Sequence, residues 1–261
     1  MSEILAPCGA MESLTAAVNA GADAVYLGEE YFSARKNADN FTAEQLCDAV
    51  RFCHYSGVKV YVTLNTLVFD REIPLLAKAI ENCAKADVDA FIVQDMGVAR
   101  LARQIVPELP LHASTQMTVN SPEGAIMAKE LGFTRVVLGR ELSFAQIKAI
   151  TESCDIETEL FVHGALCVCI SGQCYMSSVL GGRSGNRGLC AQPCRLDFTS
   201  GDRHNVLSLK DLSLTEKLPE LAKAGITSFK IEGRMKRPEY VAAAVCACRQ
   251  SLNLSLIHIS E

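Results

Sequence analysis

Short apolar segments alternate with amphipathic stretches along this chain of 261 residues, and the alternation predicts an α/β fold. Eight such segments fit the repeat of a (β/α)8 TIM-like barrel, in which functional groups gather at the carboxyl ends of the strands. The alternative is an open, doubly wound sheet. The predicted strands are residues 4–6, 24–27, 58–64, 90–93, 111–113, 135–138, 159–162 and 228–231.

Local signals at their ends support the predicted helices. Thr42 with Gln45 three residues later forms a capping-box pattern, and Ser143 suits an N-cap. Pro238 suits the first turn of a helix, and Gly21 is typical of a residue that ends one. Helices are predicted over residues 11–20, 42–57, 74–86 and 214–224, between Gly97 and Pro107, before Leu131, after Ser143 and from Pro238.

The composition indicates a globular protein with no membrane partner. Hydrophobic residues make up 49% and charged residues 21% of the chain, and no apolar run is long enough to span a bilayer. The net charge of −5 argues against nucleic-acid binding by the whole surface but allows a local basic patch. The first residues lack a signal-peptide pattern, so we expect a cytoplasmic protein with reduced cysteines.

Residues 159–194 contain five of the 12 cysteines, in a segment rich in Gly and Ser. Six, 15 and three residues separate Cys167, Cys174, Cys190 and Cys194, and thiolate ligation of a metal or cluster would explain this grouping. The alternative is that the thiols are buried as small hydrophobic groups. The last pair has a spacing that suits zinc, whereas the first pair is spaced more loosely than zinc sites usually are. Spacing alone therefore leaves zinc and an iron–sulfur cluster open.

Polar residues follow several predicted strands, and a barrel would bring them to one face. We predict that five of them form the catalytic group: His112, Gln116, His163, Lys230 and Glu232. Each has a structural alternative, because histidines near strand ends are often hydrogen-bonded within the fold and polar loop residues are often solvated.

Six basic residues lie in the loops after the last two predicted strands, which are neighbours in a closed barrel. In the alternative interpretation these residues are scattered surface charges. We predict that they bind a phosphate or a carboxylate of the substrate: Arg183, Arg187, Arg195, Arg234, Lys236 and Arg237.

A longer pattern around the cysteines resembles the signature of the collagenase-like peptidase U32 family. The resemblance covers nearly the whole chain up to about residue 250. It is carried by LAPCGAMESL, DAVYLG, FSAR, HASTQM, SLKDL, KIEGRMK and Glu159-x-Phe161-x-x-Gly164-Ala165-Leu166-Cys167-x4-Gly172-x-Cys174.

The resemblance implies a 4Fe–4S cluster held by Cys167, Cys174, Cys190 and Cys194, with Cys169 dispensable. Members of this family hydroxylate RNA, and the bacterial tRNA member uses prephenate as oxygen donor to convert the wobble uridine to 5-hydroxyuridine. Others act on ribosomal RNA or in oxygen-independent ubiquinone synthesis, and some are described as collagenases. We therefore expect an iron–sulfur enzyme that hydroxylates tRNA, or else rRNA.

Two other functions stay open at this point. A U32-type peptidase needs an activated nucleophile or a metal-bound water, and the chain has no HExxH or GxSxG motif. A Cys–His pair stays open, because His163 lies four residues before Cys167. In the second alternative the cluster is structural, and the chain is a subunit of an RNA or quinone hydroxylation complex with a homologous partner subunit.

The domain organisation follows from the same resemblance. We expect residues 1–250 to form the barrel, with a cysteine-rich insertion at 163–205, and the C-terminal domain of the family to be missing. Residues 254–261 (LSLIHISE) are expected to be a non-native tail that does not continue the preceding helix.

Overall fold

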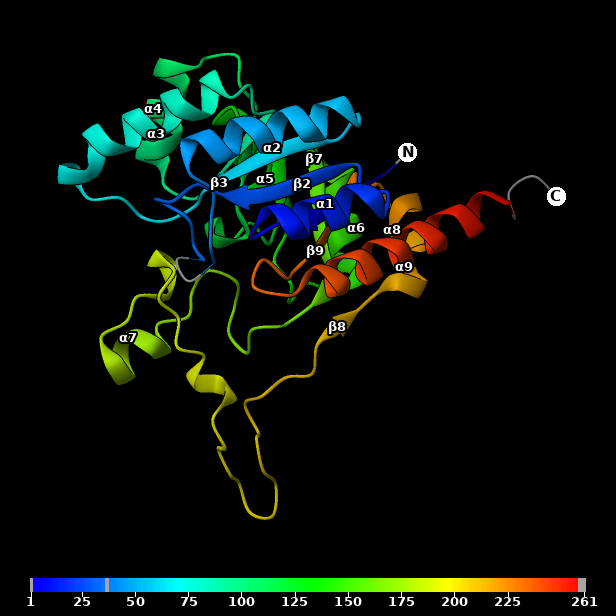
Figure 1. Ribbon diagram of the computed structural model, residues 1–261. Helices are drawn as coiled ribbons and strands as arrows, with labels where there is room; N and C mark the ends of the chain where they lie inside the picture. Colours follow the sequence, from blue (N-terminus) through cyan, green and yellow to red (C-terminus); the bar gives the residue numbers. More distant parts are fainter. Residues whose placement is uncertain (1, 36–37, 258–261) are drawn as a thin grey trace.

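A closed barrel of eight parallel strands forms the centre of the computed structural model, which describes residues 2–35 and 38–257 (Figure 1). The pairing of β6 with β7, and of β9 with both β7 and β1, leaves no open edge. The predicted barrel is confirmed, and the open-sheet alternative is wrong. The barrel strands are β1 (Glu3–Pro7), β2 (Ala24–Gly28), β3 (Lys59–Leu64), β4 (Ala90–Val93), β5 (Leu111–Ala113), β6 (Arg135–Val137), β7 (Glu157–Gly164) and β9 (Ser228–Ile231).

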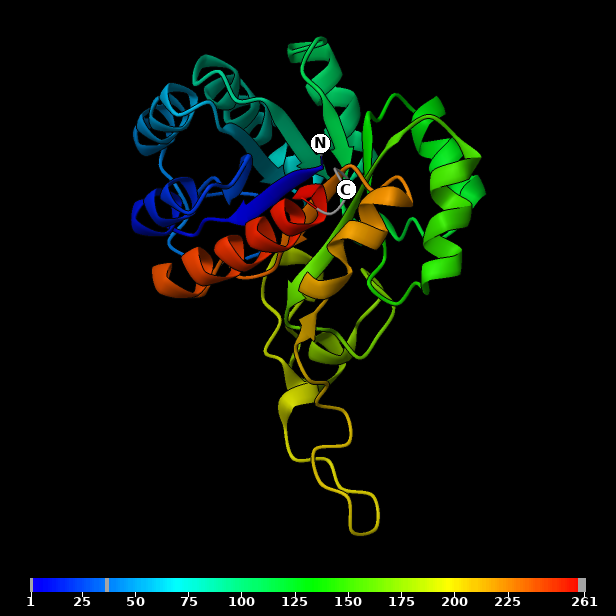
Figure 2. The ribbon, with the colours of Figure 1, turned by 90° about the vertical axis from the view of Figure 1, so that its right-hand side faces the viewer.

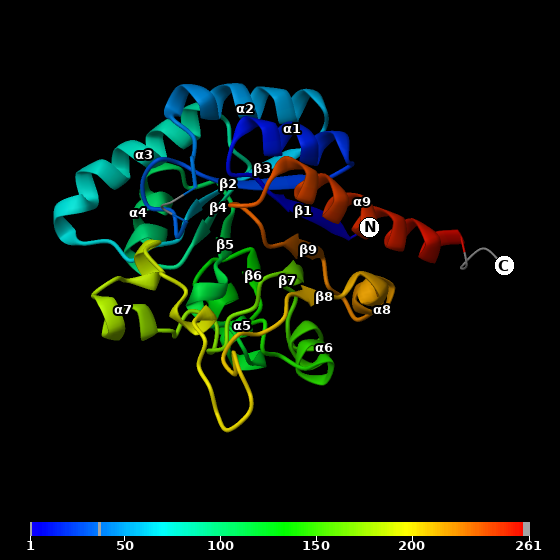
Figure 3. The ribbon, with the colours of Figure 1, turned by 60° about the horizontal axis from the view of Figure 1, so that its bottom comes forward.

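Helices surround the barrel, as Figure 3 shows. Two of them begin with a capping box. The sequence predicts the box at Thr42 and, for the other helix, only the N-cap Ser143. The side chain of Thr42 accepts from the backbone N–H of Gln45, and Ser143 does the same for Gln146. The predicted helix at 214–224 begins as a 3-10 turn, Thr215–Lys217, before it becomes α-helical. The helices are α1 (Met11–Asn19), α2 (Ala43–Tyr55), α3 (Ile73–Lys85), α4 (Met96–Ile105), α5 (Pro122–Glu130), α6 (Phe144–Ser153), α8 (Leu218–Lys223) and α9 (Pro238–Ile257).

The last helix is longer than expected. Residues 254–257 belong to α9, so the expectation that they do not continue the helix is wrong for these four positions. Residues 258–261 lie outside the described residues. No helix within 2–35 and 38–257 is long and apolar enough to cross a membrane.

Between β7 and β9 the cysteine-rich segment interrupts the repeat on the side where the strands end. It contains α7 (Met176–Gly181) and the short strand β8 (Leu212–Ser213), which pairs antiparallel with β7 and is not part of the barrel wall. A long loop within this segment, around residues 196–209, projects away from the barrel (Figure 2). The insertion therefore stands over the carboxyl ends of the strands, where barrel proteins carry their sites.

Charged side chains fill part of the barrel interior, where branched aliphatic residues are more usual. Glu159 is fully buried, and its carboxylate accepts from Lys230 Nζ at 2.6 Å and from Arg135 at 3.2 Å. Arg135 also donates to Glu3 at 2.6 Å, and Tyr61 donates to the other Glu3 oxygen at 2.7 Å. Burial alone would raise the pKa of Glu3, but Arg135 holds it below its ordinary value. The network thus consists of alternating opposite charges on β1, β6, β7 and β9.

We predict that Glu159→Gln lowers the free energy of unfolding by about 3–5 kcal/mol, because it leaves Lys230 and Arg135 buried without their shared carboxylate. Glu157→Gln is the matched control. Glu157 also pairs with Arg135, but its side chain is 52% exposed, so the expected loss is at most about 1 kcal/mol. Urea unfolding followed by circular dichroism measures both, and equal losses would contradict the structural role of Glu159.

Candidate functional site

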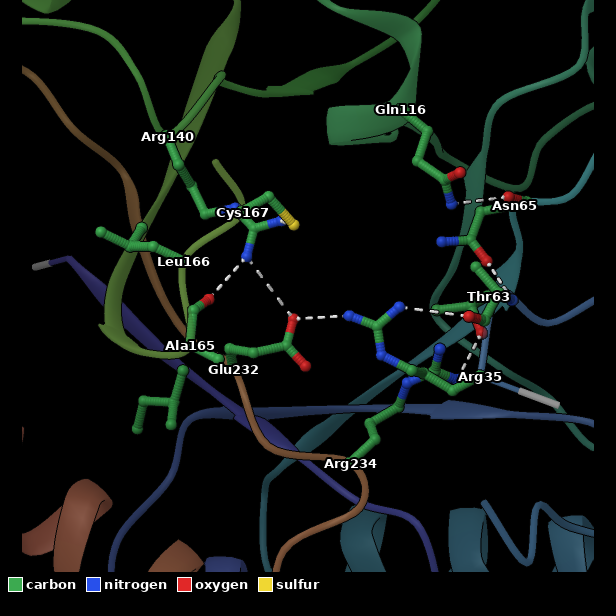
Figure 4. Close-up of polar contacts among 12 residues, drawn as sticks. Arg35, Thr63, Asn65, Gln116, Arg140, Ala165, Leu166, Cys167, Glu232 and Arg234 are labelled. Carbon is green, nitrogen blue, oxygen red and sulfur yellow. Dashed lines mark hydrogen bonds and ion pairs between the residues drawn. The ribbon is translucent and has the colours of Figure 1, made fainter. Parts of the chain in front are cut away.

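A cluster of arginines surrounds one carboxylate at the mouth of the barrel (Figure 4). Glu232 follows β9, and its Oε2 lies 3.1 Å from Arg35 and 3.9 Å from Arg140. Arg234, from the same loop as Glu232, donates to the hydroxyls of Ser33 at 2.6 Å and Thr63 at 3.1 Å. These side chains come from the loops or ends of β2, β3, β6 and β9, so only the closed barrel brings them together. We call Arg35, Arg140, Glu232 and Arg234 the mouth cluster.

The mouth cluster carries three positive charges and one negative charge. Burial would raise the pKa of Glu232, but the charges of Arg35, Arg140, Arg234 and Lys230 hold it below its ordinary value. Burial, with the adjacent Arg35, lowers the pKa of Arg234 to about 10, which leaves it protonated at neutral pH. The cluster therefore has an excess of positive charge, and an anionic ligand such as a carboxylate or phosphate would balance it.

Side-chain amides line another part of the mouth. Gln116 Nε2 donates to the Asn65 carbonyl at 3.0 Å, and Asn65 Oδ1 accepts from the backbone of Ala34 at 3.0 Å. Gln94 lies directly after β4, and its amide donates to the Gln116 carbonyl at 3.4 Å. Gln116 thus lies where the sequence predicts it, beside a group of amides that can donate to or accept from a ligand.

Two of the predicted catalytic residues lie below the mouth, in the interior. His112 is 3% exposed, and its ring packs edge-on against Tyr61 with centroids 4.8 Å apart. Burial lowers the pKa of His112 well below its ordinary value, and the charges of Arg135 and Lys230 add to this effect. Lys230 is paired with Glu159. The expected position of His112 at the mouth is wrong, because its side chain points into the interior from the middle of β5.

His163 lies at the end of β7 and contacts the loop that carries Glu232. Its Nδ1 is 2.9 Å from the Tyr240 hydroxyl, which also donates to the Glu232 carbonyl at 3.3 Å. Burial lowers the pKa of His163, with Asp211 acting in the opposite direction. Its contacts are those of a residue that fixes the β9 loop, and its catalytic role stays a prediction.

Three of the four cysteines singled out by spacing lie near enough to the fourth, Cys194, to influence its pKa. Burial raises the pKa of Cys194, Arg195 opposes this, and the thiols of Cys167, Cys190 and Cys174 raise it further. All 12 cysteines are free thiols. In the described part of the chain, no three His, Cys, Asp or Glu side chains are grouped as metal ligands. Four free thiols on one segment are chemically suitable donors for a thiolate-bound metal or cluster, but cluster binding by these residues stays a prediction.

Hydrogen bonds fasten the cysteine-rich segment to the loops after β5 and β6. The Ser171 carbonyl accepts from Thr118 at 2.9 Å, and the Ser171 hydroxyl donates to Glu141 at 2.8 Å. Gly172, the residue after Ser171, packs on the backbone of Gln116. An added Cβ there would lie 2.5 Å from the Gln116 carbonyl oxygen. These contacts fix the segment between its first and second predicted ligands.

The six basic residues do not form one exposed strip. Arg187 forms an ion pair with Glu72 at 2.6 Å and also donates to the Leu67 carbonyl. Arg234 is only 5% exposed and belongs to the mouth cluster. The others are placed separately: Arg183 and Arg195 donate to the carbonyls of Leu189 and Leu166, and Lys236 and Arg237 are exposed on the β9 loop.

Sequence reasoning missed several residues of the mouth. Arg35 is predicted only as part of the motif FSAR, and Arg140, Asn65 and Gln94 are not among the predicted site residues. Asn65, Gln94 and Arg140 follow predicted strands by one or two positions, and that position is the available signal, whereas Arg35 lies eight positions after its strand. Their side-chain directions depend on the loop conformations, which periodicity does not predict.

The barrel with a polar site at its mouth defines a (β/α)8-barrel protein, and comparison with known proteins specifies the family. A model described as peptidase family U32 matches residues 9–258. The chain belongs to the peptidase family U32. A solved U32 peptidase has the same fold, with a TM-score of 0.63 and 16% identity over 91% of this chain and 95% of that one.

Curated relatives of this chain have different names. The chain is 43% identical to a 23S rRNA 5-hydroxycytidine synthase of Escherichia coli, over 96% of this chain and 39% of the relative. It is 38% identical to tRNA hydroxylation protein P1 of Bacillus subtilis, over 96% and 63%. It is also 38% identical to a collagenase of Porphyromonas gingivalis, over 94% and 64%. The chain thus spans less than two thirds of the length of each of these relatives.

We predict that Gly172→Ala loosens the cysteine-rich segment, because the new methyl group would collide with the Gln116 backbone. Gly201→Ala is the control: Gly201 also has a positive φ of 58°, compared with 78° at Gly172, but an added Cβ would meet nothing within 4 Å. Limited proteolysis should cut residues 165–195 several-fold faster in Gly172→Ala than in Gly201→Ala. Equal cleavage rates would show that this packing does not hold the segment.

Proposed function

We propose that this chain is an iron–sulfur enzyme that hydroxylates RNA, most specifically the wobble uridine of tRNA to 5-hydroxyuridine with prephenate as oxygen donor. The observation that carries the proposal is the positively charged mouth cluster directly beside Cys167, within a chain related to tRNA and rRNA hydroxylation proteins. The mouth offers a place for an anionic small molecule next to the thiols that would hold the cofactor.

In this proposal Cys167, Cys174, Cys190 and Cys194 hold a 4Fe–4S cluster. When bound, such a cluster supplies electron transfer or an iron at which a small molecule can be activated. Cys169 lies beside Cys167 and Cys174, since both of these thiols influence its pKa, but burial is the main cause of the increase in that pKa. We assign Cys169 no ligand role.

The mouth cluster would bind the oxygen donor. Prephenate has two carboxylates, and the planar, permanently charged guanidinium groups of Arg35, Arg140 and Arg234 suit carboxylate recognition. Glu232 holds two of these groups in place through its ion pairs. Gln116 and Asn65 present amides that could hydrogen-bond to the edge of an unstacked base.

RNA phosphates would be bound by the exposed part of the predicted basic group. Lys236 and Arg237 are exposed beside the mouth, and Arg183 is on the cysteine-rich segment. Arg187 and Arg234 have partners inside the protein, so a charge reversal at either would test folding as well as RNA binding. The overall negative charge makes such a local basic surface necessary for binding a polyanion.

Peptidase activity is the second candidate, because one relative is a collagenase. A cysteine or serine nucleophile needs a base within hydrogen-bonding distance. Of the histidines within the described residues, His54 and His204 contact aspartates, His163 contacts Tyr240, and His112 is buried beside Tyr61. None is hydrogen-bonded to a cysteine or serine, which favours RNA hydroxylation. The third candidate is a structural-cluster subunit that acts with a homologous partner.

We predict that the protein purified without air contains iron and sulfide and absorbs broadly near about 400 nm, as thiolate-bound clusters do. Separate Ser substitutions of Cys167, Cys174, Cys190 and Cys194 should each remove most of the iron, whereas Cys169→Ser should retain it. Stoichiometric zinc without iron, or iron loss in Cys169→Ser alone, would contradict this assignment.

We predict that the purified chain, supplied with prephenate, adds one oxygen to uridine in tRNA from cells that lack this modification. Mass spectrometry of the digested nucleosides measures the product. Undermodified rRNA and gelatin are the competing substrates. Arg35→Gln should reduce the product at least about tenfold by removing a carboxylate contact worth about 1.5 kcal/mol or more. Gelatin hydrolysis that survives iron chelation would support the peptidase, and activity only after a homologous subunit is added would support the subunit alternative.

A further inference from the structure

Arg140 lies where the loops after β6, β7 and β9 meet (Figure 4). Its guanidinium donates to the Ala165 carbonyl at 2.9 Å and lies 3.9 Å from Glu232. Its backbone N–H donates to the Ser171 hydroxyl at 3.2 Å. One residue therefore contacts both ends of the turn that carries Cys167, and also the carboxylate of the mouth cluster.

The guanidinium of Arg140 also contacts a sulfur directly. Its terminal nitrogen lies 3.7 Å from Cys167 Sγ, within the range of a hydrogen bond to sulfur. In the part of the chain that the structure describes, Arg140 is the charged side chain that donates to one of the four predicted ligand sulfurs. Cys190, in comparison, accepts from the backbone of Gln192 at 3.3 Å.

The orientation of Arg140 is constrained. Its guanidinium stacks over the Phe161 ring at 4.8 Å, and its side chain is only 11% exposed. The buried Nε has no hydrogen-bond partner among residues 2–35 and 38–257. A planar group held by ring stacking and by a backbone carbonyl can turn little, so the direction of its contact with Cys167 is defined. Burial also strengthens its electrostatic effect on the sulfur.

We propose that Arg140 is a positioning residue that holds Cys167 against the mouth cluster and stabilises negative charge on its sulfur and on the group bound there. This inference rests on the proposed function for the role of the bound group, but the contacts with Ala165 and Cys167 do not depend on it. Since hydrogen bonds and positive charge near a cluster's sulfurs favour its more negative, reduced form, Arg140 should raise the reduction potential of a cluster at this site.

The test compares Arg140→Gln with Arg140→Lys, which keeps the charge but loses the planar fork. Arg51→Gln is the control, since Arg51 is exposed and pairs with nearby Asp48. Anaerobic redox titration should give a more negative midpoint potential for Arg140→Gln, an intermediate value for Arg140→Lys and an unchanged value for Arg51→Gln. A midpoint potential that is unchanged in Arg140→Gln with iron bound would overturn the electrostatic role.

A second measurement uses the metal-free proteins. Hydrogen–deuterium exchange across residues 165–171 should be several-fold faster in Arg140→Gln than in the unsubstituted chain, because the turn loses its contact at Ala165. Unchanged exchange would overturn the positioning role. If the unsubstituted protein binds no iron, the proposed cofactor fails, and the exchange experiment still decides whether Arg140 positions the cysteine turn.

Discussion

The buried carboxylate of Glu159 is the constraint on which the barrel interior depends. It holds Lys230 and Arg135 at once, and Arg135 in turn holds Glu3. Four strands are thereby joined through side chains as well as through backbone hydrogen bonds. Because a buried charge is costly unless it is paired, a change in the register of any of these strands would leave a buried charge without its partner.

The mouth cluster continues this pattern with one difference. The interior network pairs its charges closely, whereas the mouth gathers three arginines around the single carboxylate of Glu232. The interior network of Glu3, Glu159, Arg135 and Lys230 thus has equal numbers of positive and negative charges, whereas the mouth cluster has a net positive charge. A site that lacks negative charge is suited to an anion, and the strands below it keep its arginines in fixed positions.

The cysteine-rich segment is organised by the barrel rather than by its own secondary structure, which is limited to short helical turns and β8. Ser171 and Gly172 attach it to the loops after β5 and β6, and Arg187 attaches it to Glu72 after β3. These attachments leave Cys167 facing Arg140 at the mouth. Cys167 and the mouth cluster therefore lie side by side, although more than 100 residues separate Arg35 from Cys167 in the sequence.

The sequence by itself determined the barrel and the strand positions to within two residues at each end, since periodicity is a local property. The grouping of the four cysteines as ligands stays a prediction. The sequence also placed Gln116 and Glu232 at the mouth. It did not separate His112 and Lys230, which are buried within their strands, from residues that face a ligand. The alternation of side chains along a strand predicts which of them point inward, but it does not predict how far below the mouth a residue lies. Only the tertiary structure decided that Arg187 is paired with Glu72 and that Arg140 contacts Cys167. Those contacts join loops that are distant in sequence, and their geometry follows from barrel closure.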